Sequence, residues 1–168
     1  MERFSLAESL IKEFEGCKLE AYPDPGTGGE PYTIGWGTTR YLDGRPVKKG
    51  DKITQAEADK LLRVEIEEID RHYENKLPNY SAALSEKMKA ALISFGYNVG
   101  KNWYGHPGFT TLTRLFATRQ YKAVPNALLK YVNPGTPVEA GLTRRRVAEA
   151  ELWMEGMKEA PISLVNAA

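Results

Sequence analysis

Two acidic residues near the start of the chain, Glu15 and Asp24, have the types and spacing that suit acid–base chemistry. Eight residues separate them. Apolar residues at helical spacing precede Glu15 and Gly16 follows it, so the pattern predicts an amphipathic helix that ends at Glu15. Asp24 begins a loop rich in proline and glycine that leads into a predicted hairpin. One carboxyl group is therefore expected at a helix end and the other in a loop.

These two environments favour different protonation states. The negative end of a helix dipole and the apolar neighbours Phe14 and Ile11 favour the protonated form of Glu15, whereas a solvated loop keeps Asp24 ionised. A carboxylic acid beside a carboxylate is the arrangement used in glycoside hydrolysis. Acidic residues are usually solvated surface groups, so spacing alone leaves that alternative open.

The residues around the pair are more specific. Glu15 stands in the run F-E-G, Asp24 ends the run L-E-A-Y-P-D, and Thr33 lies in P-Y-T-I-G-W-G. Together these runs resemble the phage-type lysozymes of glycoside hydrolase family 24. The resemblance implies that Glu15, Asp24 and Thr33 are the catalytic residues, and Tyr32 beside them is a candidate for substrate contact.

Two departures from the family pattern affect this assignment. Eight residues separate Asp24 from Thr33, where the family usually has five, so counting from Asp24 gives Glu30 as the third residue. The T-I-G run gives Thr33 instead, and we prefer it because turns accept insertions more readily than strands accept a change of register. The second departure is Thr38, which stands where many members have histidine, so any ion pair of that histidine must be absent or replaced.

Two later segments extend the resemblance. Asn98 lies in a run that resembles the F-x-x-N-x-G end of the family's central helix, which implies a contact with the sugar; an ordinary helix cap is the alternative. The run G-L-T-R-R-R resembles the family's G-L-x-x-R-R segment, from which an arginine approaches the catalytic glutamate. Arg145 and Arg146 are the candidates, and a guanidinium there would oppose protonation of Glu15. Arg144 is expected on a solvated helix turn.

The expected architecture is an α+β, lysozyme-like fold in a single catalytic domain, 1–168, with a cleft between a small sheet lobe and a larger all-helical lobe. Thr54 and Glu57 form a capping box that opens a helix at about 55–75. Its acidic cluster is interpreted as a solvated face. Ser5 is expected to cap the first helix, and either Ser81 or Ser85 the helix that follows the connecting helix. Thr143 is expected to cap a helix that ends near Gly156. Short helices are expected at 109–119 and 121–132. The predicted sheet lobe is approximately 16–53, the connecting helix 54–75, and the helical lobe 76–168 together with 5–15; the tail from 161 is expected to fray.

Composition excludes several classes of function. The net charge of +1, without a long basic block, gives no sign of nucleic-acid binding. The single Cys17 allows no intrachain disulfide, and two isolated histidines with one cysteine do not make a zinc site. The N-terminal residues lack the apolar region of a signal peptide, and no run is long enough to span a membrane, so stable membrane insertion is not expected.

The resemblance implies an endolysin, an N-acetylmuramidase that hydrolyses the β-1,4 bond between N-acetylmuramic acid and N-acetylglucosamine in bacterial peptidoglycan. It implies a monomer made in the host cytoplasm and released to the cell wall through a separate holin. No cofactor is expected, because carboxyl groups and hydrogen bonds suffice for this reaction. The alternatives are a lytic transglycosylase and a non-catalytic cell-wall-binding module on the same fold.

Overall fold

The computed structural model describes residues 1–160, so the prediction for the tail lies outside the described residues. Seven helices and two strands make up this part of the chain, together with three short 3-10 turns. In chain order they are α1 (Glu2–Phe14), β1 (Lys18–Tyr22), β2 (Thr33–Gly35), α2 (Gln55–Lys76), α3 (Tyr80–Ala83), α4 (Glu86–Val99), α5 (Thr110–Ala117), α6 (Val124–Leu128) and α7 (Glu139–Met157). The α+β fold with a small sheet and a larger helical part is confirmed.

The sheet is one antiparallel hairpin of β1 and β2. Lys18 pairs with Gly35 and Tyr22 with Thr33, and the register is irregular between these pairs. Both strands lie within the predicted sheet lobe at 16–53. Isolated bridges attach the following loops to it, including one between Glu20 and Lys52. Thr33 is therefore held at the first position of β2, beside the loop that carries Asp24.

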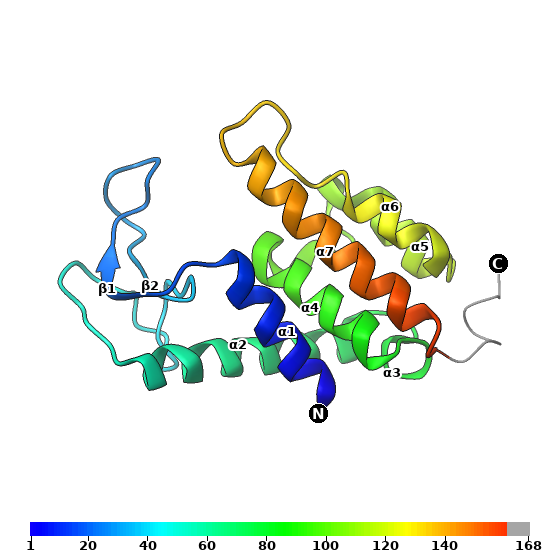
Figure 1. Ribbon diagram of the computed structural model, residues 1–168, viewed down its shortest axis with the longest axis horizontal. Coiled ribbons are helices and arrows are strands. Elements are labelled where there is room, and N and C mark those ends of the chain that lie inside the picture. Colours follow the sequence, from blue (N-terminus) through cyan, green and yellow to red (C-terminus); the bar gives the residue numbers. More distant parts are fainter. Residues whose placement is uncertain (161–168) are drawn as a thin grey trace.

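Helix α2 runs from the hairpin along the helical part of the molecule (Figure 1). The predicted capping box is confirmed, since Thr54 and Glu57 bond to each other's backbone N–H groups. One face of the helix is apolar and buried, at Ala58, Leu62, Ile66, Ile69 and Tyr73.

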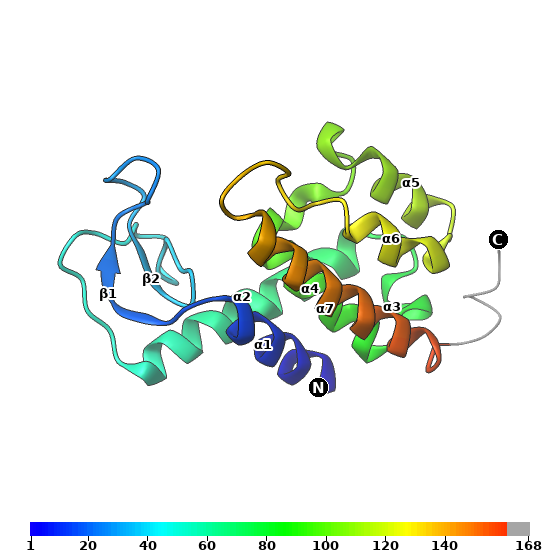
Figure 2. The ribbon, with the colours of Figure 1, turned by 45° about the horizontal axis from the view of Figure 1, so that its top comes forward.

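Helix α4 is the centre of the helical part and packs against both α1 and α7 (Figure 2). Every residue from Met88 to Gly96 is buried. Gly96 permits a close crossing with α2, because a β-carbon there would lie 1.8 Å from the hydroxyl of Tyr73. That crossing fixes the end of α4 that carries Tyr97 and Asn98.

Several predicted helix boundaries are wrong. Met1, not Ser5, is the N-cap of α1, and Val138 precedes α7, so Thr143 lies inside that helix. Thr143 is no cap, since its hydroxyl donates to the carbonyl of Glu139 within the helix at 2.8 Å. Ser85 does cap α4. The predicted helix at 121–132 is shorter, a 3-10 turn followed by α6.

The acidic cluster of α2 is not a solvated face throughout, so that interpretation is wrong. Asp70 is buried and forms a bidentate pair with Arg3 at 2.9 and 3.0 Å, and it also accepts a bond from Tyr80 at 2.8 Å. Arg3 reaches Glu86 as well, at 2.8 Å. We call these four residues the Arg3 cluster; it anchors the N-terminal end of α1.

Candidate active site

Glu15 is the first residue after α1 rather than a member of its last turn. Its backbone is extended, with φ −94° and ψ 131°, while its N–H still bonds to the carbonyl of Ile11 at 2.8 Å. The carboxyl group is half-buried, with 27% of the side chain exposed.

Arg145 of α7 contacts Glu15 directly. Its Nη1 lies 2.6 Å from Glu15 Oε1, although the two residues are 130 positions apart. The guanidinium is only 2% exposed and also donates to the carbonyl of Ser94 at 3.0 Å. Arg144 is exposed, as expected. The predicted approach of an arginine to Glu15 is thus present in the structure, and Arg145 makes it.

Gly37 and Tyr97 lie on the other side of Glu15. Gly37 has a φ of +105°, and a β-carbon there would be 3.6 Å from both Glu15 Oε2 and the Tyr97 hydroxyl. Tyr97 donates a 2.6 Å hydrogen bond to the carbonyl of Trp36. Burial raises the pKa of Tyr97, with Glu65 and Glu15 adding to the effect, so its hydroxyl stays a donor at neutral pH. This bond ties α4 to the glycine-rich segment after β2.

The hairpin carries the other two predicted catalytic residues. Asp24 is half-buried, and its Oδ1 accepts hydrogen bonds from the N–H groups of Gly26 and Thr27 at 2.8 and 2.9 Å. Thr33 is half-buried and pairs with Tyr22, whose pKa is raised by burial and by the nearby charge of Glu15. Tyr22 therefore connects the surroundings of Thr33 with those of Glu15.

The candidate residues Glu30 and Tyr32 have different exposures. Glu30 is exposed in the loop between the strands, and Tyr32 is half-buried immediately before β2. The longer loop thus leaves Thr33 in the strand, which is the position that the T-I-G run indicated.

Asn98 is exposed at the end of α4 and accepts a hydrogen bond from Arg146 Nη2. Arg146 is completely buried, and its guanidinium lies 4.8 Å from the centre of the Phe95 ring. The helix itself ends at Gly100. Asn98 is consequently oriented by a side chain from α7 and presents the rest of its amide to solvent.

Glu65 of α2 and Thr38 line the same hollow as Gly37 and Tyr97. Thr38 replaces the histidine expected from the family pattern, and its buried hydroxyl has no hydrogen-bond partner among residues 1–160. Burial raises the pKa of Glu65 to about 7, and the charges of Glu68 and Glu15 add to the rise. Glu65 is thus a half-buried acid near Glu15.

These groups line two surface hollows. One, of about 470 Å³, is lined by Gly37, Thr38, Glu65 and Tyr97; the other, of about 880 Å³, is lined by Glu15, Asn98 and Arg145 together with the start of α7. Tyr97 thus lines the first hollow and Glu15 the second.

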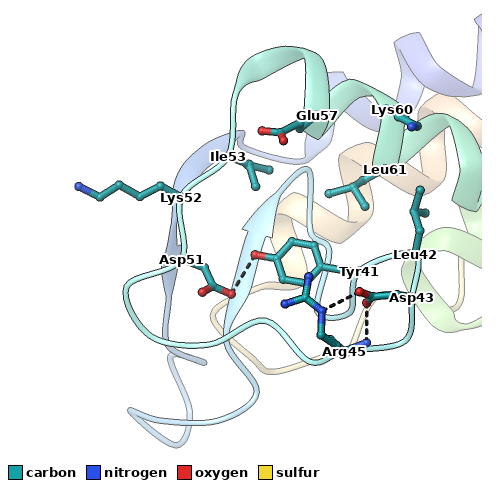
Figure 3. A pocket seen from close by; sticks show the side chains of 10 residues that line it. All are labelled: Tyr41, Leu42, Asp43, Arg45, Asp51, Lys52, Ile53, Glu57, Lys60 and Leu61. Carbon is teal, nitrogen blue, oxygen red and sulfur yellow. Dashed lines mark hydrogen bonds and ion pairs between the residues drawn. The ribbon is translucent and has the colours of Figure 1, made fainter.

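A third hollow, of about 460 Å³, lies in the small lobe (Figure 3). Its polar groups largely satisfy one another: Tyr41 donates to Asp51 at 2.9 Å, and Arg45 donates to Asp43 at 2.6 Å. Glu57 belongs to the capping box of α2. This hollow therefore has few polar groups left for a ligand, and the chemistry is concentrated around Glu15.

The part of the chain that the structure describes has no group of three or more His, Cys, Asp or Glu side chains arranged to hold a metal ion. None of its helices is both long enough and apolar enough to cross a bilayer.

Comparison with known families gives a direct match. The family model described as phage lysozyme matches residues 12–149, most of the chain. The chain belongs to the phage lysozyme family. Within that family, it is 34% identical over 146 residues to an endolysin of Lactococcus phage c2, covering 86% of this chain and 57% of the relative. The chain thus spans just over half the length of this relative, and 52% of an endolysin of Bacillus phage B103.

Solved structures of phage lysozymes have the same fold. An endolysin from the Escherichia coli O157:H7 phage FAHEc1 aligns with a TM-score of 0.70 at 28% identity, covering 89% of this chain and 91% of the other. A crystal structure of a P22 lysozyme mutant aligns with a TM-score of 0.68 at 26% identity, covering 88% and 94%.

Sequence reasoning missed several groups that surround Glu15. Tyr97, Tyr22 and Glu65 were not predicted as neighbours, and neither was the buried Glu149 of α7, described below. Glu149 follows Arg145 by four residues and Arg146 by three, so helical spacing alone could have indicated it. Nothing in the sequence shows that this face of the helix is buried.

Proposed function

We propose that this protein is a peptidoglycan hydrolase, a muramidase that cleaves the β-1,4 bond between N-acetylmuramic acid and N-acetylglucosamine. The observation that carries the proposal is the half-buried Glu15, held by Arg145 beside a hollow of about 880 Å³, at the position where the family motif has its glutamate. Membership of the phage lysozyme family and the similarity to endolysins support the same activity.

In the proposed reaction Glu15 is the general acid. It gives its proton to the glycosidic oxygen as the bond to the anomeric carbon breaks. Arg145 Nη1, 2.6 Å from Glu15 Oε1, holds the carboxyl group in place for this transfer.

Asp24 and Thr33 are proposed to hold the attacking water on the opposite face of the sugar. The backbone N–H groups bonded to Asp24 Oδ1 fix this carboxylate, and within residues 1–160 those bonds leave Oδ2 available for water. Direct attack by that water inverts the anomeric centre, which requires the two carboxyl groups to stand about 6.5–9.5 Å apart.

Asn98 and Tyr32 are proposed to contact the sugars directly. Arg145 and Arg146 are buried, so in this proposal they serve substrate binding through Glu15 and Asn98. The protein would act as a monomer on the cell wall, after synthesis in a host cytoplasm and release through a holin.

Clearing of a suspension of outer-membrane-permeabilised bacteria tests the activity. We expect the purified protein to clear the suspension and Glu15→Gln to lose roughly 10²–10⁴-fold in rate, because an amide cannot donate the proton. Glu20→Gln, an exposed change on β1, is the matched control and should keep its activity. Full activity in a folded Glu15→Gln variant would refute the assignment, and absence of clearing by the wild-type protein would favour a non-catalytic module.

The products decide the reaction type. Mass spectrometry should find reducing ends that have gained water; 1,6-anhydromuramic acid would indicate a lytic transglycosylase instead. NMR of the nascent reducing end should give the α-anomer first. A β-anomer as first product, or a glycosyl group attached to Asp24, would make Asp24 a nucleophile.

A further inference from the structure

Glu149 of α7 is a completely buried carboxylate that the reaction described above does not use. Its Oε1 accepts a hydrogen bond from Ser94 at 2.8 Å and lies 3.3 Å from Arg145 Nε. Its Oε2 lies 2.8 Å from Arg146 Nη1, without the alignment of a hydrogen bond. Burying a charge is costly unless it is paired, so this carboxylate belongs to a paired arrangement.

The contacts of Glu149 lead to two residues of the proposed active site. Arg145 continues to Glu15, and Arg146 continues to Asn98. Helical spacing makes this possible, because positions 145, 146 and 149 lie on one face of α7. We call Glu15, Arg145, Glu149 and Arg146 the Arg145 cluster.

Charges alternate along this cluster. Arg145 lies between two carboxylates, so its positive charge is shared between Glu15 and Glu149. Arg146 is the less firmly held cation: its Nε and Nη1 make no hydrogen bond within residues 1–160, and burial lowers its pKa. Burial raises the pKa of Glu149, and the two arginines oppose that rise.

Other titratable groups around these carboxylates contribute to the same electrostatic field. Tyr22 of the hairpin, Glu65 of α2 and Tyr97 of α4 face Glu15. Tyr73 of α2 is the further titratable group near Glu149. The three tyrosines are neutral at physiological pH, since burial raises the pKa of each. Glu65 and Glu149 are therefore the two nearby groups that offset the charge of Arg145.

We propose that Glu149 is a positioning residue for the reaction proposed above. Glu149 fixes Arg145 against Glu15, fixes Arg146 against Asn98, and offsets the arginine charge beside the acid. The proposal rests on the role proposed for Glu15. Without Glu149, only Glu65 would offset the charge of Arg145 beside Glu15, so Glu15 would release its proton at lower pH in the variant than in the wild-type protein.

Glu149→Gln tests this, because glutamine has the same shape and can still accept the bond from Ser94. We expect the alkaline limb of the pH–activity profile to move to lower pH by about one unit, with kcat reduced more than KM is raised. Glu155→Gln removes an exposed charge from the same helix, away from the hollow beside Glu15, and should leave the profile unchanged. Carboxyl ¹³C NMR should report the same shift for the titration midpoint of Glu15, independently of activity.

Arg146→Gln supplies the reverse test and also covers the case in which Glu149→Gln does not fold. In this variant Arg145 is the one arginine that still pairs with Glu149, so its charge is offset more completely. Glu15 should then titrate at higher pH, and the alkaline limb of the profile should move to higher pH. Shifts of opposite sign would support the proposal, because general structural damage cannot produce them. If the Glu15 midpoint stays unchanged in the folded variants, or both variants shift in the same direction, the proposal is overturned. If the midpoints shift as expected while Glu15→Gln keeps its activity, the proposed function fails and the electrostatic role of Glu149 stands.

Discussion

Charged clusters of opposite polarity anchor the two ends of α1. One cluster stabilises the fold, whereas the other contains the acid of the proposed active site. At the N-terminal end, Arg3 is surrounded by carboxylates and a tyrosine, and the Asp70 and Arg3 side chains are 6% and 8% exposed. At the C-terminal end, Glu15 meets Arg145 and is 27% exposed. The Arg3 cluster contains a bidentate pair, whereas Glu15 and Arg145 of the Arg145 cluster line a hollow of about 880 Å³.

This contrast shows that buried charges alone do not mark an active site. Both clusters join α1 to later helices, and both contain an arginine with two carboxylates. Glu86 of the Arg3 cluster is even more exposed than Glu15, with 33% against 27% of the side chain, but Glu15 and Arg145 line a hollow. The hollow beside the acid, and not the exposure of its charge, distinguishes the two clusters.

Breaking the Arg3 cluster should give the largest change in stability. Asp70→Asn leaves the buried Arg3 with an uncharged partner on α2, so we expect a loss of about 3–5 kcal/mol in the free energy of unfolding. Activity per folded molecule should not change. Denaturant unfolding and activity assays on the folded fraction check this. A loss of turnover in the folded fraction would show that the Arg3 cluster does more than stabilise the fold.

Substitutions at Thr33 and Glu30 test which of the two residues belongs to the proposed active site. Thr33→Ala should reduce activity roughly 10–100-fold, about 1.4–2.7 kcal/mol in transition-state free energy, if Thr33 helps to hold the water. Glu30→Ala should have little effect, because Glu30 is exposed in the loop. Parallel clearing rates of the two variants decide, and a larger loss for Glu30→Ala would assign the third position to Glu30.

Glu65 gives a pH-dependent effect. Its pKa in the folded protein, about 7, lies above the ordinary value of 4.5, so folding takes up a proton and stability falls as pH rises between these values. Glu65→Gln should match the wild-type protein at pH 4 and exceed it at pH 8 by about 1–2 kcal/mol, after allowance for partial exposure. Thermal melts across this range measure the difference; Glu67→Gln on the same helix is the control, and equal pH dependence in wild type and Glu65→Gln would exclude the effect.

The smallest effect is expected at an exposed pair. Arg45 bonds to Asp43 at 2.6 Å in the small lobe, a distance as short as that of the pair between Arg145 and Glu15. Because both side chains are largely exposed, Asp43→Asn should leave the melting temperature and the clearing rate essentially unchanged. A marked loss of either would show that the hollow beside this pair has a role.

Local sequence determined a large part of this protein. The periodicity and capping box of α2 gave its bounds to within a residue, because those signals act within a single helix. The motif around Glu15 gave the family, and the T-I-G run gave the position of Thr33 at the start of β2. Each of these features depends on neighbours that are close in sequence.

Tertiary structure decided which charged residues are buried and what they contact. The sequence treated the acidic residues of α2 as one solvated face, yet Asp70 and Glu65 turn inward while Glu68 stays exposed. The sequence indicated Arg145 and Arg146 as equivalent candidates. Only the packing of α7 against α4 shows that Arg145 contacts Glu15 and Arg146 contacts Asn98. Glu149 was not predicted at all. A helical pattern shows which residues share a face, but the burial of a charge depends on partners 50 to 130 positions away, which only the folded chain brings into contact.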